Sequence, residues 1–444
     1  MTTDVLIRQA HILLPDGQML LGDVLVKNGK IRDIASFIDT NIDDHGKVID
    51  AEGLTLLPGV IDPQVHFREP GLEHKEDLFT ASCACAKGGV TSFLEMPNTK
   101  PLTTTQSALN DKLERAAAKC LVNYGFFMGA TAENLPDLRD ANPSCGIKIF
   151  MGSSHGHLLV STEEEIEPIF AEGSRLIAVH AEDQARINQR RQEFKGATNP
   201  AIHSQIQDKQ AALNATKLAL KLSKKYQRRL HILHLSTGEE AELLRQDKPS
   251  WVTTEVTPQH LLLNVSAYDK IGTLAQMNPP LRTEDDNAVL WQALQDGVID
   301  FIATDHAPHT LEEKGKGYPQ SPSGMPGVET SLALMLTQAK EGRCTYAQVA
   351  NWMSTAPAKA YEIAQKGLIA PGYDADLVLV DLQEYRPVLR EEIVSKCGWS
   401  PFEGWRLTGW PQYTLVGGQV VYEKGHIHTE VRGKALQFGI SDNG

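Results

Sequence analysis

Short apolar runs of strand length recur along the middle of the chain, and polar helical patterns separate most of them. The runs are nearly continuous in their apolar character, which is typical of parallel strands buried on both faces. Eight of them begin at residues 59, 91, 123, 146, 175, 229, 251 and 300. Eight parallel strands within about 250 residues predict a (β/α)8 TIM barrel, and we assign residues 58–362 to it.

The two ends of the chain follow a different pattern, in which short alternating stretches are separated by turns. These stretches occupy residues 4–14, 22–34, 375–382 and 413–427. An Asn28-Gly29 dipeptide indicates a tight hairpin turn in the second stretch. Each end alone is too small to enclose a good core. We therefore expect residues 1–57 and 363–444 to pair into a small β-sandwich domain beside the barrel, in a protein of the α/β class.

Composition and charge narrow the classes of partner. The chain has 444 residues and a formal net charge of -13, which argues against non-specific binding to nucleic acid or to anionic membranes. Its first residues contain Asp4 and no long apolar run, so neither a signal peptide nor a membrane anchor is indicated. The six cysteines include no CxxC pair, which favours buried free thiols in a reducing cytoplasm.

Polar side chains gather at the carboxyl ends of the predicted barrel strands. The residues that follow directly on an apolar run are Gln64, His66, Asn98, Lys148, His180, His234 and Asp305. In a barrel these ends meet at one rim, which is where active sites are built. One such residue alone would be explained as an ordinary polar strand end, but five strands that supply His, Lys, His, His and Asp favour a site. His231, three residues before His234, is expected to point into the helix layer.

The residue types at this rim suit a metal centre. Histidine nitrogens and the Asp305 carboxylate are donors that zinc accepts. Lys148 cannot bind a metal through an ammonium group, but a lysine whose pKa is lowered by burial can react with carbon dioxide, and the carbamate has two oxygens that can bridge two metals. A lysine paired with an acid inside the barrel is the alternative, and spacing does not separate the two. Two zinc ions about 3.5–4 Å apart would activate water for hydrolysis at an amide-type carbon, with Asp305 as the proton carrier.

An ordered set of motifs along nearly the whole chain resembles the dihydroorotases of the amidohydrolase superfamily. The most specific motif is ATDHAPH, which begins at Ala303 and is followed after four residues by Lys314. The other motifs are VHFREPG, EMPNT, GIKIFMGSS, AVHAED, HLST, EVTP, MNPPLR and SPFEGW. One of these motifs alone would be weak evidence, whereas the ordered set is strong.

The resemblance implies the reversible cyclisation of N-carbamoyl-L-aspartate to dihydroorotate in pyrimidine synthesis, with one or two zinc ions (Zn2+) per chain. By position, His66 and Asp305 would bind the first ion, and His180 and His234 the second. Lys148, in its N6-carboxylated form, would bridge them. Asp305 would also serve as the general acid and base.

The resemblance also implies the substrate contacts. Arg68, Asn98 and His309 would hold the free carboxylate of the substrate, and Asn278 would contact the amide edge of its ring. A guanidinium fork is well suited to a planar carboxylate, and Arg68 stands two residues beyond His66 on the same rim.

Two positions depart from the family pattern. Gln64 stands where the family has the first histidine of a His-x-His pair, and a glutamine carbonyl binds zinc more weakly than an imidazole. Gln259 takes the place of another histidine found in many relatives. Lys148 and Asp305 are retained, so we interpret Gln64 as a variant ligand in a working site.

Two other functions remain open from the sequence. A hydantoinase, dihydropyrimidinase or allantoinase would use a similar site, but its substrate has no free carboxylate and would leave Arg68 without a purpose. A non-catalytic, dihydroorotase-like partner of aspartate transcarbamoylase is compatible with Gln64, although such a scaffold needs neither Lys148 nor Asp305. A homodimer is the default expectation for the assembly. The Gly- and Pro-rich segment 314–327 is either a mobile cover over the site or a static loop.

Overall fold

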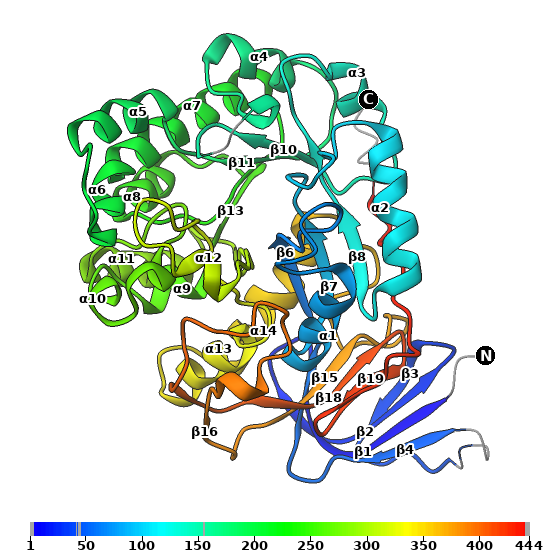
Figure 1. Cartoon of the computed structure of the whole chain (residues 1–444). Helices are drawn as coiled ribbons and strands as arrows, with labels where there is room; N and C mark the ends of the chain where they lie inside the picture. Colours follow the sequence, from blue (N-terminus) through cyan, green and yellow to red (C-terminus); the bar gives the residue numbers. More distant parts are fainter. Residues whose placement is uncertain (1–3, 41, 43–45, 154–155, 440–444) are drawn as a thin grey trace.

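A closed barrel of parallel strands forms the centre of the molecule in a computed structural model that describes residues 4–40, 42, 46–153 and 156–439 (Figure 1). The barrel strands are β6 (Val60–Val65), β7 (Val90–Glu95), β8 (Asn123–Phe126), β9 (Met128–Gly129), β10 (Ile147–Phe150), β11 (Ile177–His180), β12 (Leu230–Ile232), β13 (Val252–Val256) and β14 (Phe301–Ile302). Only Phe127 separates β8 from β9, so the two act as one bent strand. The predicted (β/α)8 barrel is confirmed.

Hydrogen bonds join the barrel strands into two sheets, β6–β7–β8 and β9 to β14. The circle closes at both junctions. Phe127 donates its backbone N–H to the carbonyl of Glu95, and a parallel bridge joins Val65 to His306 just beyond β14. This closure brings the carboxyl ends of β6 and β14 side by side, although about 240 residues separate them in the sequence.

Helices cover the outside of the barrel. The longer ones are α1 (Leu78–Gly88), α2 (Gln106–Lys119), α3 (Leu135–Asp140), α4 (Glu163–Ala171), α5 (Gln184–Glu193), α7 (Lys209–Tyr226), α8 (Gly238–Asp247), α11 (Glu284–Gln295) and α13 (Ser331–Lys340). Shorter ones are α6 (His203–Ile206), α9 (Pro258–Leu262), α10 (Ala267–Ile271), α12 (Leu311–Lys314), α14 (Tyr346–Ala350) and α15 (Ala356–Ala360). Helix α7 shows why they pack: Ala211, Ala215, Ala219 and Leu222 recur at helical spacing and are all buried. Several helices begin at side-chain caps, such as Asp77 before α1.

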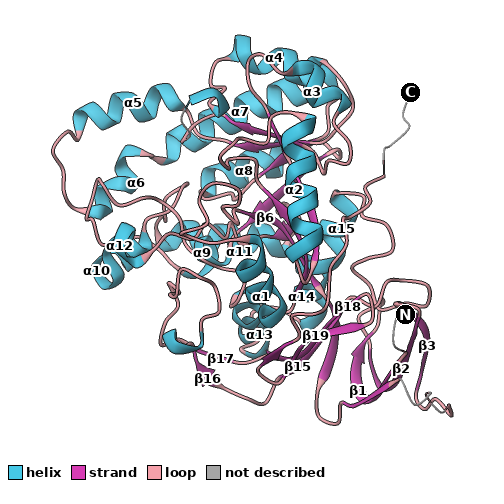
Figure 2. Cartoon of the chain, turned by 45° about the vertical axis from the view of Figure 1, so that its right-hand side comes forward, coloured by secondary structure: helices cyan, strands magenta, loops and turns pink. Residues whose placement is uncertain are grey.

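Both ends of the chain build a second unit beside the barrel, next to α1 (Figure 2). Its strands are β1 (Val5–Leu13), β2 (Met19–Lys27), β3 (Lys30–Ala35), β4 (Lys47–Asp50), β5 (Thr55–Pro58), β15 (Leu377–Asp381), β18 (Trp410–Val416), β19 (Gln419–Glu423) and β20 (His426–Ile427). β5 pairs antiparallel with β15 and so joins the two ends, as predicted. All nine strands belong to one hydrogen-bonded sheet, and its apolar cluster includes Ile7, Val26, Leu377 and Leu415. Strands β16 (Arg386–Pro387) and β17 (Arg406–Leu407) form a separate pair.

The expectation that the cysteines are buried free thiols is met. All six cysteines are free and buried. No helix within the described residues combines the length and the apolar character needed to cross a membrane.

Candidate active site

His66 and Asp305 meet where β6 and β14 end. Nε2 of His66 lies 3.1 Å from Oδ1 of Asp305, and Nδ1 of His66 lies 2.7 Å from Oδ1 of Asn98. Since the Asn98 oxygen only accepts, the ring proton of neutral His66 sits on Nδ1. Burial lowers the pKa of His66, although Asp305 opposes this, so the neutral ring is favoured. Its Nε2 and the Asp305 oxygen are then two acceptors that face each other, as they would around a cation.

Gln64 lies beside this pair, as the strand alternation predicts. Its Nε2 donates to Oδ1 of Asp305 at 3.2 Å. Its Oε1 is buried and has no hydrogen-bond partner among the described residues. A buried acceptor without a partner is costly, so this oxygen is suited to an additional ligand.

His180 and His234 form a second pair at the ends of β11 and β12. Nδ1 of His180 lies 2.9 Å from Nε2 of His234. On its other side His180 directs Nε2 to Oε2 of Glu182 at 2.7 Å, which places its proton on Nε2 and leaves Nδ1 as an acceptor. Burial, with the nearby His180 and Lys148, lowers the pKa of His234 well below its usual value, so this ring is neutral. Nδ1 of His234 is buried without a partner in the described structure.

Lys148 projects from β10 into the barrel and is 1% exposed. Its Nζ lies 4.5 Å from the centroid of the Phe150 ring, and within the described residues it makes no ion pair. Burial lowers its pKa to about 7, while Asp305 and Glu255 act in the opposite direction. The alternative of a lysine paired with an acid is therefore not what the structure shows. A substantial fraction of this amine is neutral at physiological pH, as a reaction with carbon dioxide requires.

Arg68 and His309 form a polar edge on the same rim. Nη2 of Arg68 lies 3.2 Å from Nε2 of His309, and its Nε donates to the carbonyl of Pro308. Burial lowers the pKa of Arg68 to about 10, which still leaves it charged at neutral pH. Burial, together with Arg68 and Lys75, lowers the pKa of His309 well below its usual value, so that ring is neutral.

The other two predicted substrate contacts have different surroundings. The Asn98 oxygen is engaged with His66, as described above. Oδ1 of Asn278 lies 2.8 Å from Nε2 of His203, a buried histidine in α6. The structure thus brings Asn98 to the first histidine, and it places Asn278 against a residue from the segment between β11 and β12.

Strained backbone accompanies these side chains. Arg68, His234 and Asp305 have φ values of 69°, 36° and 47°, in the left-handed region that residues other than glycine rarely adopt. Such conformations cluster at functional sites, where the surrounding structure imposes them. Here the left-handed conformations change the direction of the backbone at three rim residues, each just beyond the end of its strand.

Comparison with known proteins places this site in a family. Residues 55–421 match the model of the amidohydrolase family. The chain belongs to the amidohydrolase family. It is 37% identical to a dihydroorotase of Methanosarcina mazei over 431 residues, which cover 94% of each chain. It is 36% identical to a dihydroorotase of Halobacterium salinarum over 91% of this chain and 96% of the relative.

Solved structures agree with the fold. The L-hydantoinase (dihydropyrimidinase) of Arthrobacter aurescens superposes on this amidohydrolase with a TM-score of 0.93 and 32% identity, over 98% of this chain and 100% of that one. The dihydropyrimidinase of Brevibacillus agri gives a TM-score of 0.90 at 27% identity, over 98% and 99% of the two chains. The family predicted from the motifs is confirmed.

The donors at this rim are arranged as two pairs and do not form one cluster. Within the described residues, no three His, Cys, Asp or Glu side chains gather in a group that could hold a metal ion. The site offers two pairs instead, His66 with Asp305 and His180 with His234. The partnerless Gln64 oxygen adds a donor beside the first pair. The ring proton of His66 is held by the Asn98 oxygen, and that of His180 by the Glu182 carboxylate. Such oxygen partners are usual around metal-binding histidines.

One sequence prediction about the rim is wrong. His231 does not point into the helix layer: its ring stacks on Phe301 at 4.8 Å, and its Nε2 lies 3.0 Å from Oε2 of Glu255 inside the barrel. The physical reason is that β12 ends at Ile232 and the backbone turns at His234. Alternation along a strand therefore does not relate the two histidines.

Sequence reasoning also missed three residues that contact the site. Glu182 binds His180, Glu255 receives the backbone N–H of His234, and His203 binds Asn278. Only Glu182 carries a usable signal, because it lies two residues after His180 within the AVHAED motif. No local pattern in the sequence links His203 to Asn278.

Proposed function

We propose that this amidohydrolase is a dihydroorotase, which closes N-carbamoyl-L-aspartate to dihydroorotate with loss of water and catalyses the reverse ring opening. The observation that carries the proposal is the Arg68–His309 pair on the rim of the site. Dihydroorotate carries a free carboxylate on its ring, and a guanidinium fork is the best match for it. The names of the similar curated proteins support the same activity.

The surroundings of Arg68 favour a fixed, orienting charge. Its Nε is committed to the Pro308 carbonyl, so the fork is held in one orientation. His309 is neutral and also contacts the carbonyl of Ser323 through Nε2, at 3.0 Å. A carboxylate at this edge would therefore meet one permanent cation and a neutral ring, which selects for one anionic group.

We further propose zinc as the metal. His66 and Asp305 would hold one ion with Gln64 as a weak additional ligand, and His180 and His234 a second, with the carboxylated Lys148 between them. When bound, zinc supplies a Lewis acid for the carbonyl and makes water acidic enough to react near neutral pH. Asp305 then moves the proton, from the attacking water to the ring nitrogen that leaves in ring opening. In cyclisation the same carboxylate carries it back.

A hydantoinase is the second candidate, because the L-hydantoinase of Arthrobacter aurescens is so similar in structure. Its ring substrate lacks the carboxylate that Arg68 would bind. Two observations disfavour a non-catalytic partner of aspartate transcarbamoylase. Burial lowers the pKa of Lys148 to about 7, and His66 and Asp305 lie 3.1 Å apart. A homodimer and a cytoplasmic location stay predictions, of which the first is tested by light scattering on the purified protein.

The deciding experiment measures zinc per chain and turnover of dihydroorotate, hydantoin and allantoin on one purified sample. We expect turnover of dihydroorotate at least a hundredfold faster than that of the other two rings. Asp305→Ala should abolish turnover while the protein stays folded by circular dichroism, and Arg245→Gln, an exposed arginine on α8, is the matched control for the preparation. A preference for hydantoin, or no turnover after zinc and bicarbonate are supplied, would overturn the proposal.

A further inference from the structure

A cavity of about 220 Å³ opens at the end of the barrel opposite to the candidate active site. Its lining includes Gly146, Arg175 and Arg229, which lie just before the strands β10, β11 and β12 begin. On the same strands, His180 is the last residue of β11 and His234 follows β12, so these two histidines lie at the opposite ends of the strands. The cavity is therefore distinct from the rim, and it needs its own explanation.

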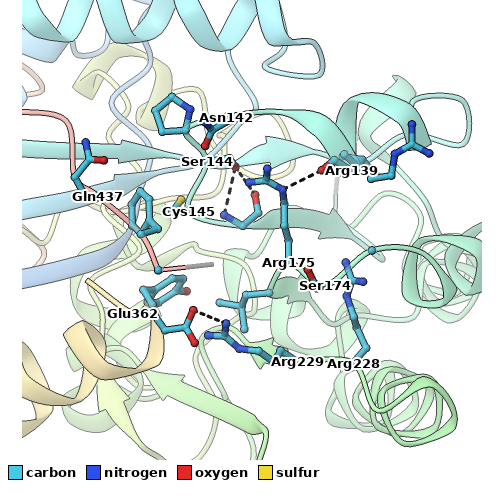
Figure 3. A pocket seen from close by; sticks show the side chains of 18 residues that line it. Arg139, Asn142, Ser144, Cys145, Ser174, Arg175, Arg228, Arg229, Glu362 and Gln437 are labelled. Carbon is cyan, nitrogen blue, oxygen red and sulfur yellow. Dashed lines mark hydrogen bonds and ion pairs between the residues drawn. The ribbon is translucent and has the colours of Figure 1, made fainter. Parts of the chain in front are cut away.

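The wall of this cavity is strongly basic. Four arginines line it, Arg139, Arg175, Arg228 and Arg229, against the single carboxylate of Glu362. Four positive charges and one negative charge leave a net charge of three on the lining residues. Figure 3 shows these arginines, of which Arg139 points away from the others, and a dashed line from Arg229 to Glu362. That ion pair measures 2.8 Å, and Arg139 pairs outside the lining with Asp140.

Arg228 is the unusual member of the group. It is 4% exposed, and within the described residues no carboxylate pairs with it. Nη1 donates to the carbonyl of Glu172, but Nε is buried without any partner. Burial, together with the adjacent Arg175 and Arg229, lowers its pKa to about 10. A buried guanidinium that keeps its charge without an anion is unfavourable, so an anion bound beside Arg228 would be stabilising.

The arginine is also held in place rather than free to swing into solvent. Helix α7 ends at Gln227 in a left-handed cap, and the backbone N–H of Arg228 returns to the carbonyl of Ser223. The Ser223 hydroxyl donates to the carbonyl of Arg228 at 2.7 Å. The backbone that presents the guanidinium is thereby fixed before any ligand arrives, which limits the entropy lost on binding.

A second donor in the same lining has no partner. The hydroxyl of Tyr361 is buried and makes no hydrogen bond in the described structure. Burial raises the pKa of Tyr361 well above its usual value, so the hydroxyl keeps its proton. Two independent donors without partners, one charged and one neutral, thus line a single basic cavity.

We propose that this cavity binds inorganic phosphate or a phosphate monoester through Arg228, Arg175 and the hydroxyl of Tyr361. A phosphate group has several acceptor oxygens arranged around a centre, which suits donors that come from separate elements better than a flat carboxylate does. Its double negative charge offsets most of the net charge of the wall. The site lies outside the catalytic rim and is independent of the proposed dihydroorotase activity.

The test is calorimetric titration of the full-length protein with inorganic phosphate and, separately, with ribose 5-phosphate. We expect one saturable site per chain. Tyr361→Phe keeps the volume of the ring and should weaken binding about tenfold to 150-fold, since one hydrogen bond to a charged oxygen is lost. Arg228→Lys removes the fork and should weaken it more. Tighter binding of the ribose ester identifies a monoester as the ligand, and equal or weaker binding identifies free phosphate.

Two controls separate this site from the rest of the molecule. Arg245→Gln, on the exposed surface of α8, should leave binding unchanged. Arg68→Gln removes the cation of the candidate active site and should also leave it unchanged. No saturable binding of either probe up to about 10 mM, the range of very weak complexes, would overturn the proposal. Binding that survives in Tyr361→Phe at full strength but disappears in Arg68→Gln would overturn it as well.

Discussion

Glu182→Gln tests whether the carboxylate behind His180 controls the metal centre. Glu182 is fully buried, and its Oε2 receives Nε2 of His180 at 2.7 Å and the Ser153 hydroxyl at 2.6 Å. Burial alone would raise the pKa of Glu182, but the hydrogen bonds from His180 and Ser153 lower it below its usual value. The carboxylate is therefore charged in the folded protein, and it fixes the ring proton of His180 on the side away from His234.

The expected loss of zinc affinity follows from the hydrogen bond that a glutamine at position 182 would still accept from His180. A hydrogen bond to a charged group contributes about 1.5–3 kcal/mol, and a neutral amide oxygen that still accepts preserves about 0.5–1.5 kcal/mol of it. The loss is about 1–2 kcal/mol, or roughly fivefold to thirtyfold in the affinity for the ion on His180. Losses of about 10–100-fold are typical when such outer partners of metal ligands are changed.

The assay is a zinc competition titration against a chromophoric chelator at fixed pH, with the thermal unfolding midpoint measured on the same samples. Glu240→Gln is the matched control, because Glu240 is also buried and accepts from Thr216 and Thr237, and within the described residues it makes no hydrogen bond to His180 or His234. Glu240→Gln should lower stability without changing zinc affinity. Unchanged zinc affinity in a folded Glu182→Gln protein would refute the assigned role of the carboxylate.

Three further outcomes are expected. Arg68→Lys keeps a charge but loses the fork, so KM for dihydroorotate should rise at least tenfold, and an unchanged KM would contradict the carboxylate contact. Gln64→His should tighten zinc at the first pair about tenfold, because an imidazole is a better ligand than an amide oxygen; flat metal content and rate would place residue 64 outside the metal centre. Only the neutral amine of Lys148 reacts with carbon dioxide and its pKa is about 7, so at equal concentrations of dissolved carbon dioxide the reactivation of metal-free protein should be about tenfold slower at pH 6 than at pH 8, and a pH-independent rate would argue against carboxylation.

The barrel and its rim could be predicted because the physical signal is local. Parallel strands covered on both faces must be apolar at nearly every position, so a few consecutive residues are enough to identify each strand. The point at which the apolar run stops is equally local, and it selected His66, His180, His234 and Asp305. Lys148 departs from the expectation, because it lies inside β10 rather than beyond its end. Pairing of the two chain ends followed from size alone, since neither end has enough apolar residues for a core.

Contacts between distant segments carry no such signal. Gln64 donates to Asp305 across 241 positions of sequence, and His203 reaches Asn278 across 75. The first contact forms because the barrel returns its last strand to its first, and the second joins the segments that follow β11 and β13. The surroundings of Arg228 are equally hard to predict from the sequence, because an arginine in a loop of different geometry would reach solvent or a carboxylate.

The backbone turns at the rim explain both the success and the error of the sequence-based predictions. Arg68, His234 and Asp305 all adopt left-handed φ values just beyond a strand, each at a cost of about 1–3 kcal/mol. A side chain that merely ended a strand would relax to an ordinary conformation, because nothing would offset that cost. Here hydrogen bonds hold the three turns or their side chains: Pro308 accepts from Arg68, Glu255 accepts from His234, and Gln64 donates to Asp305. The same turn at His234 breaks the alternation that would have placed His231 correctly. Three strained turns that carry predicted site residues, one of them bonded to Gln64, therefore support the proposal that Gln64 belongs to a working site.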